Sequence, residues 1–424
     1  MRGRERAEQG AAARELGLGS LFALGVNGIV GVGIFFTPNL VAAIVPGHVG
    51  TWAYALTAAL LVPVAVVYGT LGARFDRDGG PTVWAHAAYG PLAGFLVGLI
   101  AYCSAVFSTA AVIAGLGEYT APLLGVTGEL MRRGFALSAL LGFALLVMTG
   151  LKPSAWLWSA LTVLKLLPLF ALLLAFSTHS GAAQAADAGA TRSGGLLRAA
   201  LVIVFPLQGF EIVPVPASRV RSRLAVPLAT LGSLLFAALL YVALHEACLS
   251  ALPDLTRAKS PLVEAARQMG GRSLGELVSL GTNVSVIGIA FGMLVMTPRY
   301  LAALAGREVL GPWLREETAS HVPLRALWVT ALLVSVLVAS HTLSHLFVLS
   351  SIAVLTQYAV SALSLARLAF TRQHGLLRRH ALAAPLALCA VLLLVLSAER
   401  AELATMAGLI AFGLLLWFVR KARS

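Results

Sequence analysis

Charged side chains are scarce in this chain. They make up 12% of its 424 residues, whereas hydrophobic residues make up 59% and the mean hydropathy is +0.88. Soluble globular domains carry about 25% charged residues, so this composition excludes that class. The basic excess, 31 Lys and Arg against 18 Asp and Glu, stands in short clusters between apolar runs and not along one helix face, which argues against a nucleic-acid partner. We therefore predict an all-α integral membrane protein whose surroundings are a lipid bilayer.

The sequence also has few groups for covalent or metal chemistry. Its three cysteines, Cys103, Cys248 and Cys389, all lie in apolar segments and at no metal-ligand spacing. No apolar stretch carries paired His and Asp ligands, a Gly-x-Ser-x-Gly elbow or a nucleophile beside a base. We expect no bound metal, no cofactor and no enzymatic activity. The polar residues 1–15 precede a long interrupted helix, so we expect no removable signal peptide.

Long apolar runs dominate the chain. With about 20 residues needed to cross a bilayer, twelve runs qualify as transmembrane spans. We expect two further amphipathic helices, in 73–90 and in 260–270. If the N-terminus is cytoplasmic, 21 Lys and Arg lie on the cytoplasmic side and 9 on the outer side, a bias that favours a multi-pass protein of the cytoplasmic (inner) membrane with both termini in the cytoplasm. The predicted spans are 18–44, 50–72, 90–119, 134–150, 153–176, 196–217, 225–250, 274–304, 322–340, 344–366, 381–397 and 401–419.

Two of these spans contain glycine and proline breaks at matching places in the two halves. One break is Gly31-Val32-Gly33-Ile34-Phe35, and the other is Phe205-Pro206-Leu207-Gln208-Gly209-Phe210-Glu211. Broken backbone survives at membrane depth only where it lines a cavity or is buried in protein. Close packing through small residues would also explain Gly31 and Gly33 taken alone. The pairing, however, favours the substrate site of a secondary transporter, where freed amides and carbonyls bind the substrate.

Two ionisable residues lie deep inside predicted spans. A charge at the bilayer centre costs at least about 2.5–3.5 kcal/mol, so such residues usually face a cavity or a partner. Lys165 is too far from either end of its span to reach the interface easily. Glu211 has two interpretations of nearly equal weight, a structural hydrogen bond across the break and a direct part in proton coupling.

The motifs around the breaks resemble those of the amino acid–polyamine–organocation transporters. The resemblance extends in order over roughly residues 16–370, and four signatures in sequence are far more specific than one. The signatures are Gly31–Phe35 with Pro38; Gly79-Gly80-Pro81 with Trp84 and Tyr89-Gly90; Gln208–Glu211; and Arg299–Ala303 with Gly306-Arg307 and Leu310-Gly311-Pro312.

This resemblance implies an inverted repeat of two five-helix units, with spans one and six broken. The units would be 18–176 (spans 1–5) and 196–366 (spans 6–10), joined by an outer connector at 177–195. A cytoplasmic tail at 1–17 would precede them. Two peripheral helices and a cytoplasmic tail, at 367–424, would follow them.

The resemblance also implies site residues. The substrate carboxylate would meet the first break, and the α-amino group would meet the second. Val32 stands where many relatives carry Ser or Thr, so a hydroxyl donor is missing here. The carboxylate site would be the backbone around Ile29, Gly31, Val32, Gly33 and Ile34; the amino site would be the backbone at Phe205, Gln208 and Gly209, with the Phe205 ring as a gate over the substrate.

In similar proton-coupled transporters, a lysine of the fifth span stands where sodium-coupled relatives bind a cation between spans one and eight. Desolvation disfavours the charged form of an amine, so Lys165 could release and regain a proton during transport. We therefore expect proton-coupled symport of an amino acid, and a neutral one because the predicted cavity holds no acidic residue besides Glu211. Sodium-coupled or uncoupled exchange or export of amino acids or amines is the alternative. A non-transporting scaffold or an enzyme is the alternative from another class. The sequence does not indicate an oligomeric state.

Overall fold

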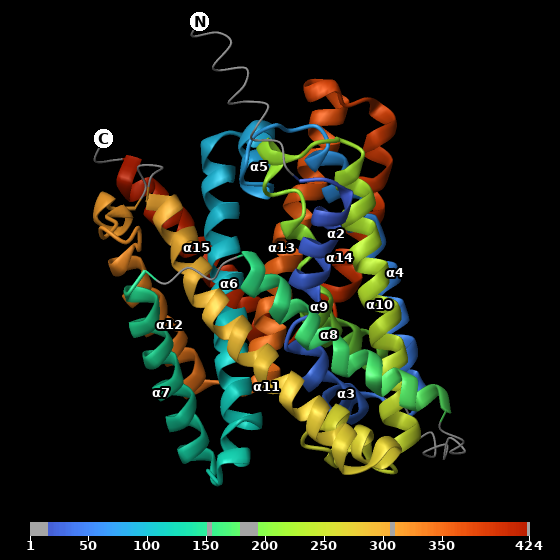
Figure 1. The fold of residues 1–424 in the computed structure, drawn as a ribbon. Coiled ribbons are helices and arrows are strands. Elements are labelled where there is room, and N and C mark those ends of the chain that lie inside the picture. The colour runs from blue at the N-terminus through green and yellow to red at the C-terminus, as the bar shows by residue number, and fades with distance from the viewer. Residues whose placement is uncertain (1–15, 151–154, 179–193, 306–309, 422–424) are drawn as a thin grey trace, which may run out of the picture.

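The protein is described by a computed structural model that covers residues 16–150, 155–178, 194–305 and 310–421 (Figure 1). Most of the predicted tail 1–17, most of the connector 177–195, and the Gly306-Arg307 motif lie outside these ranges. The helices are α2 Leu18–Ile29, α3 Gly33–Ile44, α4 His48–Gly72, α5 Pro81–Tyr89, α6 Pro91–Tyr119, α7 Glu129–Met148, α8 Ala155–Thr178, α9 Gly195–Leu207, α10 Ala225–Ala251, α11 Pro261–Ala305, α12 Leu324–Ser340, α13 Leu343–Phe370, α14 Ala383–Val395 and α15 Arg400–Lys421.

Each predicted span coincides with a helix or with a pair of helices, except for the second half of 196–217. Within the described ranges, eight helices are long and apolar enough to cross a membrane, and the bent pair α2 and α3 makes a ninth. The described part of α8, together with α9 and α12, is apolar but shorter. An all-α membrane architecture is thus confirmed, whereas twelve crossings and the inverted repeat stay predictions.

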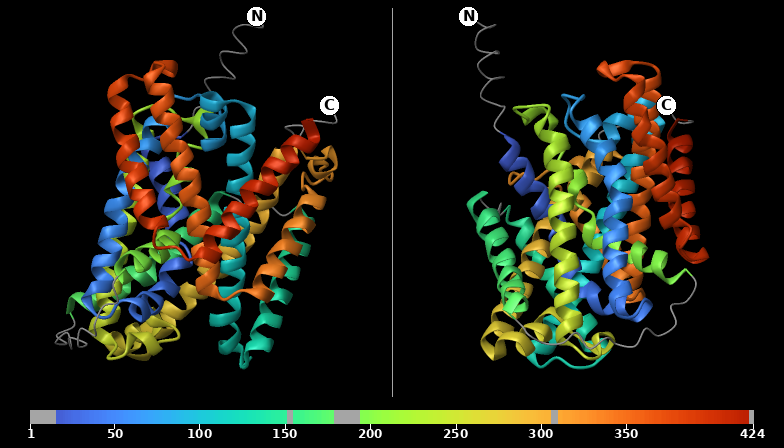
Figure 2. Two further views of the ribbon diagram at one scale, coloured as in Figure 1. Left: turned by 180° about the vertical axis from the view of Figure 1, so that it is seen from behind. Right: turned by 90° about the vertical axis from the view of Figure 1, so that its right-hand side faces the viewer.

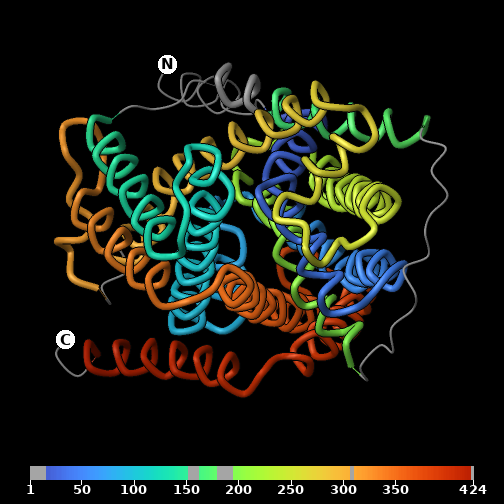
Figure 3. Tube along the Cα trace, turned by 90° about the horizontal axis from the view of Figure 1, so that it is seen from below, coloured from blue at the N-terminus to red at the C-terminus, as the bar shows by residue number. Residues whose placement is uncertain are grey.

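The helices form a bundle with the broken spans inside it. Figure 1 shows the short helices α2, α3 and α9 surrounded by longer ones, and Figure 3 shows α14 and α15 along one edge of the bundle. In both views of Figure 2, α15 runs along the outside. The start of α2 and the end of α15 lie at the same face of the bundle, as expected for termini on one side of the membrane (Figure 1).

The first predicted break is confirmed. Helix α2 ends at Ile29, α3 begins at Gly33, and the two axes are bent by 48°. Helix α3 continues through Pro38, which lies in its second turn. The residues between the two helices, Val30 to Val32, therefore interrupt the ladder of helical hydrogen bonds within the bundle.

The second break is also present, but the prediction of a helical span over 196–217 is wrong in its second half. Helix α9 ends at Leu207, Gln208 is extended, and Gly209 has a φ of 123°. Beyond them lie only short 3-10 turns, η2 Phe210–Ile212 and η3 Ala217–Arg219. Pro214 and Pro216 lack an N–H and disfavour helical geometry in the residues before them, so this segment cannot build a regular helix.

Backbone contact joins the two breaks. A Cβ on Gly33 would lie 2.6 Å from Cβ and 2.7 Å from Cα of Pro206. A Cβ on Gly209 would overlap the backbone of Gly28 and would lie 2.7 Å from the nitrogen of Ile29. Only glycine permits this approach, so the two breaks lie against one another.

The two predicted amphipathic helices are present with different bounds. Within 73–90, the helix is α5, which begins at Pro81 after Gly80 with a φ of 51°. Within 260–270, the helix is the first part of α11. It is separated from the rest of α11 by a kink at Gly270 and Gly271.

We expect Gly33→Ala to lower the stability of the protein. The added methyl group would push α3 away from Pro206, and overpacking of this kind costs about 1–3 kcal/mol. The measurement is the unfolding temperature of the purified protein in detergent. Gly142→Ala on α7 is the matched control, because nothing lies within 4 Å of its added methyl group. Equal unfolding temperatures for both variants would show that α3 and α9 do not pack closely at Gly33.

Candidate functional site

The first break leaves backbone groups free of helical partners. The N–H of Val30 still bonds to the Val26 carbonyl at 2.8 Å, which closes the last turn of α2. Helix α3 begins at Gly33, and the first N–H groups of a helix have no intrahelical acceptor. Such an N-terminus favours an anion through its free donors and its dipole. Ile29, Val32 and Ile34 are buried, and Ile289 of α11 lies closest to the open side of Gly31.

One predicted backbone ligand already has a partner. The carbonyl of Ile29 accepts a hydrogen bond from the Tyr241 hydroxyl of α10 at 2.9 Å. Tyr241 is not among the predicted site residues, because the sequence does not show what a tyrosine in an apolar span bonds to. This bond ties α10 to the end of α2.

At the second break, the Gln208 side chain belongs to a buried polar cluster. Its Nε2 donates to the hydroxyl oxygens of Ser108 on α6 at 3.1 Å and of Ser350 on α13 at 3.0 Å. The two serine oxygens are 2.7 Å apart. Sequence reasoning missed both serines, since isolated hydroxyls are common in apolar spans. The cluster places three uncharged polar groups beside the break.

Glu211 holds the second break together. Its Oε2 accepts the Gly209 N–H at 2.7 Å and the Tyr358 hydroxyl of α13 at 2.8 Å. The first bond satisfies a donor that the break frees, and the second fastens the break to α13. These contacts fit the structural interpretation of Glu211; its part in proton coupling stays a prediction.

The Phe205 ring lies at the end of α9, directly before the break. It stacks on Phe347 of α13 with ring centroids 4.0 Å apart and an interplanar angle of 14°. It is 6% exposed. An aromatic side chain next to freed backbone is well placed to cover a ligand, while the gate itself stays a prediction.

Lys165 reaches the first broken span. Its Nζ donates to the backbone carbonyl of Asn27 in α2 at 3.0 Å, and the side chain is 3% exposed. Thr162, one turn earlier on α8, donates to the side-chain oxygen of Asn27 at 3.0 Å. Helix α8 also packs directly against α11, where Pro168 meets Gly281. The structure thus brings Lys165 to span one and its helix to span eight.

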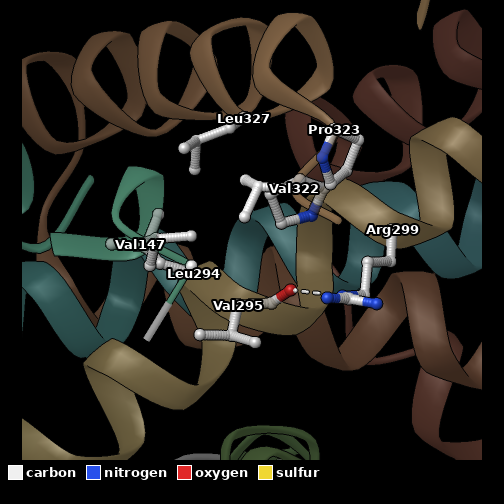
Figure 4. A pocket seen from close by; sticks show the side chains of 9 residues that line it. Val147, Leu294, Val295, Arg299, Val322, Pro323 and Leu327 are labelled. Atoms are coloured by element: carbon white, nitrogen blue, oxygen red, sulfur yellow. Dashed lines mark hydrogen bonds between the residues drawn. The ribbon is translucent and has the colours of Figure 1, made fainter. Parts of the chain in front are cut away.

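A separate groove lies away from the breaks, between the ends of α7 and α11 and the start of α12 (Figure 4). Val147, Leu294 and Leu327 give it apolar walls. Arg299, part of the fourth signature, donates from Nε to the Val295 carbonyl at 3.2 Å. None of the predicted site residues lines this groove, so it is distinct from the candidate site.

Comparison with known proteins shows that about two thirds or more of this chain is similar to amino acid transporters. An arginine/ornithine antiporter of Pseudomonas aeruginosa is 28% identical over 77% of this chain and 70% of its own length. Human cationic amino acid transporter 4 is 25% identical over 66% of this chain and 48% of its own. A serine/threonine exchanger of Bacillus subtilis is 24% identical over 76% of this chain and 75% of its own.

A family model matches nearly the whole chain, including both broken spans and the peripheral helices. The amino acid permease model matches residues 16–418. With its paired helix breaks and its permease signatures in order, the chain belongs to the amino acid permease family of the amino acid–polyamine–organocation superfamily.

Proposed function

We propose that the protein is a secondary active transporter that moves a neutral amino acid across the cytoplasmic membrane by alternating access. The observation that carries this proposal is the direct contact of two broken helices inside the bundle. The substrate carboxylate would bind the backbone from Ile29 to Ile34, at the N-terminus of α3. The α-amino group would bind the backbone of Phe205, Gln208 and Gly209, with the Phe205 ring as the gate.

The uncharged polar groups beside the second break support a neutral substrate. Gln208, Ser108 and Ser350 can bond a hydroxyl or amide of a substrate side chain, but they supply no charge to pair with a cation. Exchange of cationic amino acids is the second candidate. It is favoured by the names of two relatives, the arginine/ornithine antiporter and cationic amino acid transporter 4.

Proton coupling is proposed to depend on Lys165. When charged, its ammonium would hold α2 through the Asn27 carbonyl. When neutral, it would hold that carbonyl less strongly, because hydrogen bonds from charged donors are roughly twice as strong as neutral ones. Loss of the proton would therefore let spans one and five separate. Sodium-coupled or uncoupled transport is the alternative mechanism.

The orientation of the chain is proposed from its charge. Both described ends lie at one face of the bundle (Figure 1). The predicted spans put 21 Lys and Arg on the side of the termini and 9 on the other side, and this excess supports a cytoplasmic position for that face.

A thermal-shift screen of the purified protein against the twenty amino acids, L-ornithine and common amines tests the substrate class. A ligand at a concentration about 100 times its Kd stabilises the folded state by about 2.7 kcal/mol, so we expect the largest upward shift from a neutral L-amino acid. The methyl ester of that amino acid is the control, and it should lose the shift because α3 then meets no carboxylate. The largest shift with L-arginine or L-ornithine would support the second candidate. A protein stabilised by amines as strongly as by amino acids would contradict the carboxylate site.

Lys165→Ala is expected to abolish the accumulation of substrate driven by a pH gradient, because the bond to Asn27 and the titrating amine are both lost. The measurement is uptake into proteoliposomes under an imposed pH gradient, with and without sodium. Lys259→Ala, which removes an exposed lysine, is the control and should accumulate substrate normally. Exchange of internal for external substrate across the proteoliposome membrane, at equal pH on both sides, should continue in Lys165→Ala. Full proton-driven accumulation by this variant, or a wild type that responds to sodium alone, would rule out the coupling role.

Glu211→Gln separates the two interpretations of Glu211. A glutamine oxygen still accepts the Gly209 N–H and the Tyr358 hydroxyl, so we expect this variant to fold and to keep its pH-driven uptake. Glu211→Ala loses both acceptor contacts, each worth about 1 kcal/mol, and should unfold at a lower temperature. If Glu211→Gln folds normally but loses the pH response, Glu211 itself carries the coupled proton.

A further inference from the structure

A bidentate ion pair fastens the first turn of α9 to the first turn of α15. The Arg198 guanidinium donates to both carboxylate oxygens of Glu402, each at 2.8 Å. A further bond, at 3.1 Å, goes to Glu399. The Glu402 side chain is 1% exposed, whereas that of Glu399 is 68% exposed. Two parallel donors on one buried carboxylate fix both the distance and the relative orientation of the two side chains. The contact with Glu402 therefore constrains Arg198 more than the single bond to Glu399 does.

The residues that join α14 to α15 add backbone contacts to the same turn. We call residues 396–402 the α14–α15 corner. Within it, Ser397 donates its hydroxyl to the Leu197 carbonyl at 3.1 Å. The N–H of Glu399 donates to the Glu402 carboxylate at 2.7 Å, which holds that carboxylate facing Arg198. Helix α14 in turn packs against α4 and α13. The corner therefore links α9 to helices that contain no break.

One face of α15 packs on α6, where Gly413 lies against Leu96 and Leu99 and the Trp417 ring lies beside Phe95. Phe412, Leu415 and Phe418 are exposed on the bundle surface, where apolar side chains face lipid. Figure 2 shows α15 along the outside of the bundle. The apolar contacts of α15 named above thus lie on α6, whereas the buried ion pair at its first turn reaches α9.

Any axial movement at Arg198 is transmitted to the site. Phe205 and Arg198 lie on the same uninterrupted helix, about 10 Å apart along its axis at about 1.5 Å per residue. Next to Phe205, Pro206 touches Gly33 so closely that a Cβ would not fit. The corner holds one end of α9, and backbone contact holds the other. The position of α9 along its axis relative to α3 is therefore defined.

We propose that Arg198 is a positioning residue. Through it, the α14–α15 corner sets the position of α9 along its own axis, and thereby the position of the second break relative to the break of span one. The peripheral helices would then serve as the anchor of the substrate half-helix. The positioning itself concerns the fold. Its effect on transport rests on the function proposed above.

The test replaces both charges, because Arg198→Met alone would leave the Glu402 carboxylate buried and unpaired, which destabilises the fold for a reason unrelated to positioning. The variant is Arg198→Met with Glu402→Leu, and the rescue is the exchanged pair, Arg198→Glu with Glu402→Arg. Arg272→Met with Glu276→Leu is the matched control, since it removes an exposed Arg–Glu pair on α11 whose distance is 2.6 Å.

Two measurements separate the positioning from the transport. Hydrogen exchange of the amides of 201–205 and 207, without substrate, should be about tenfold faster in the apolar double variant at an unchanged unfolding temperature, because local opening becomes easier. Uptake of L-serine and of L-arginine should show KM raised about tenfold with the maximal rate nearly unchanged, since binding groups are displaced. The exchanged pair should restore both values, and the control should match the wild type.

Wild-type hydrogen exchange and KM in the apolar double variant would overturn the proposal, as would an exchanged pair that behaves no better than the apolar one. If the wild type takes up neither these two nor any other amino acid of the thermal-shift screen, the proposed function fails, while hydrogen exchange still decides whether the corner holds α9.

Discussion

The centre of this protein depends on one constraint, the need to satisfy backbone hydrogen-bonding groups away from water. Each break frees such groups, and side chains bind some of them. Tyr241 bonds the Ile29 carbonyl, and Glu211 bonds the Gly209 N–H. Because Tyr241 is on α10 and Glu211 is bonded to α13, the two breaks are stable only within the assembled bundle. The donors at the start of α3 are the groups that a substrate carboxylate would bind.

Glycine makes the contact between the breaks as close as backbone allows. Gly33 against Pro206 and Gly209 against Gly28 leave no room for a side chain. Closely packed elements cannot deform gradually, so a change at one break must be accompanied by a change at the other. Alternating access in the proposed transporter would use this coupling, with α9 held at its outer end by the α14–α15 corner.

The ionisable groups are divided between the two breaks. Lys165 bonds the backbone of α2 just before the first break, and Glu211 bonds the backbone of the second. Gln208, Ser108 and Ser350, which lie between α9, α6 and α13, are uncharged. This arrangement places the ionisable groups against the backbone of the two breaks and leaves neutral polar groups for the substrate side chain. It is the physical basis for proposing proton coupling and a neutral substrate.

The fold class and the positions of the helices could be predicted from the sequence, because apolar runs and the scarcity of charge reflect the lipid surroundings directly. The break of span one followed from Gly31 and Gly33. The end of α9 followed from Gln208 and Gly209. The sequence prediction failed for the segment after Gly209, where Pro214 and Pro216 replace the expected helix with 3-10 turns.

The sequence by itself therefore determined which residues interrupt the spans and which ionisable residues lie deep in them, since both are local properties. Only the tertiary structure decided what those residues contact. The partners of Gln208, Ile29 and Arg198 lie a hundred residues or more away in the chain. No periodicity or motif identifies such partners, because hydroxyls and carboxylates in distant helices meet through packing alone.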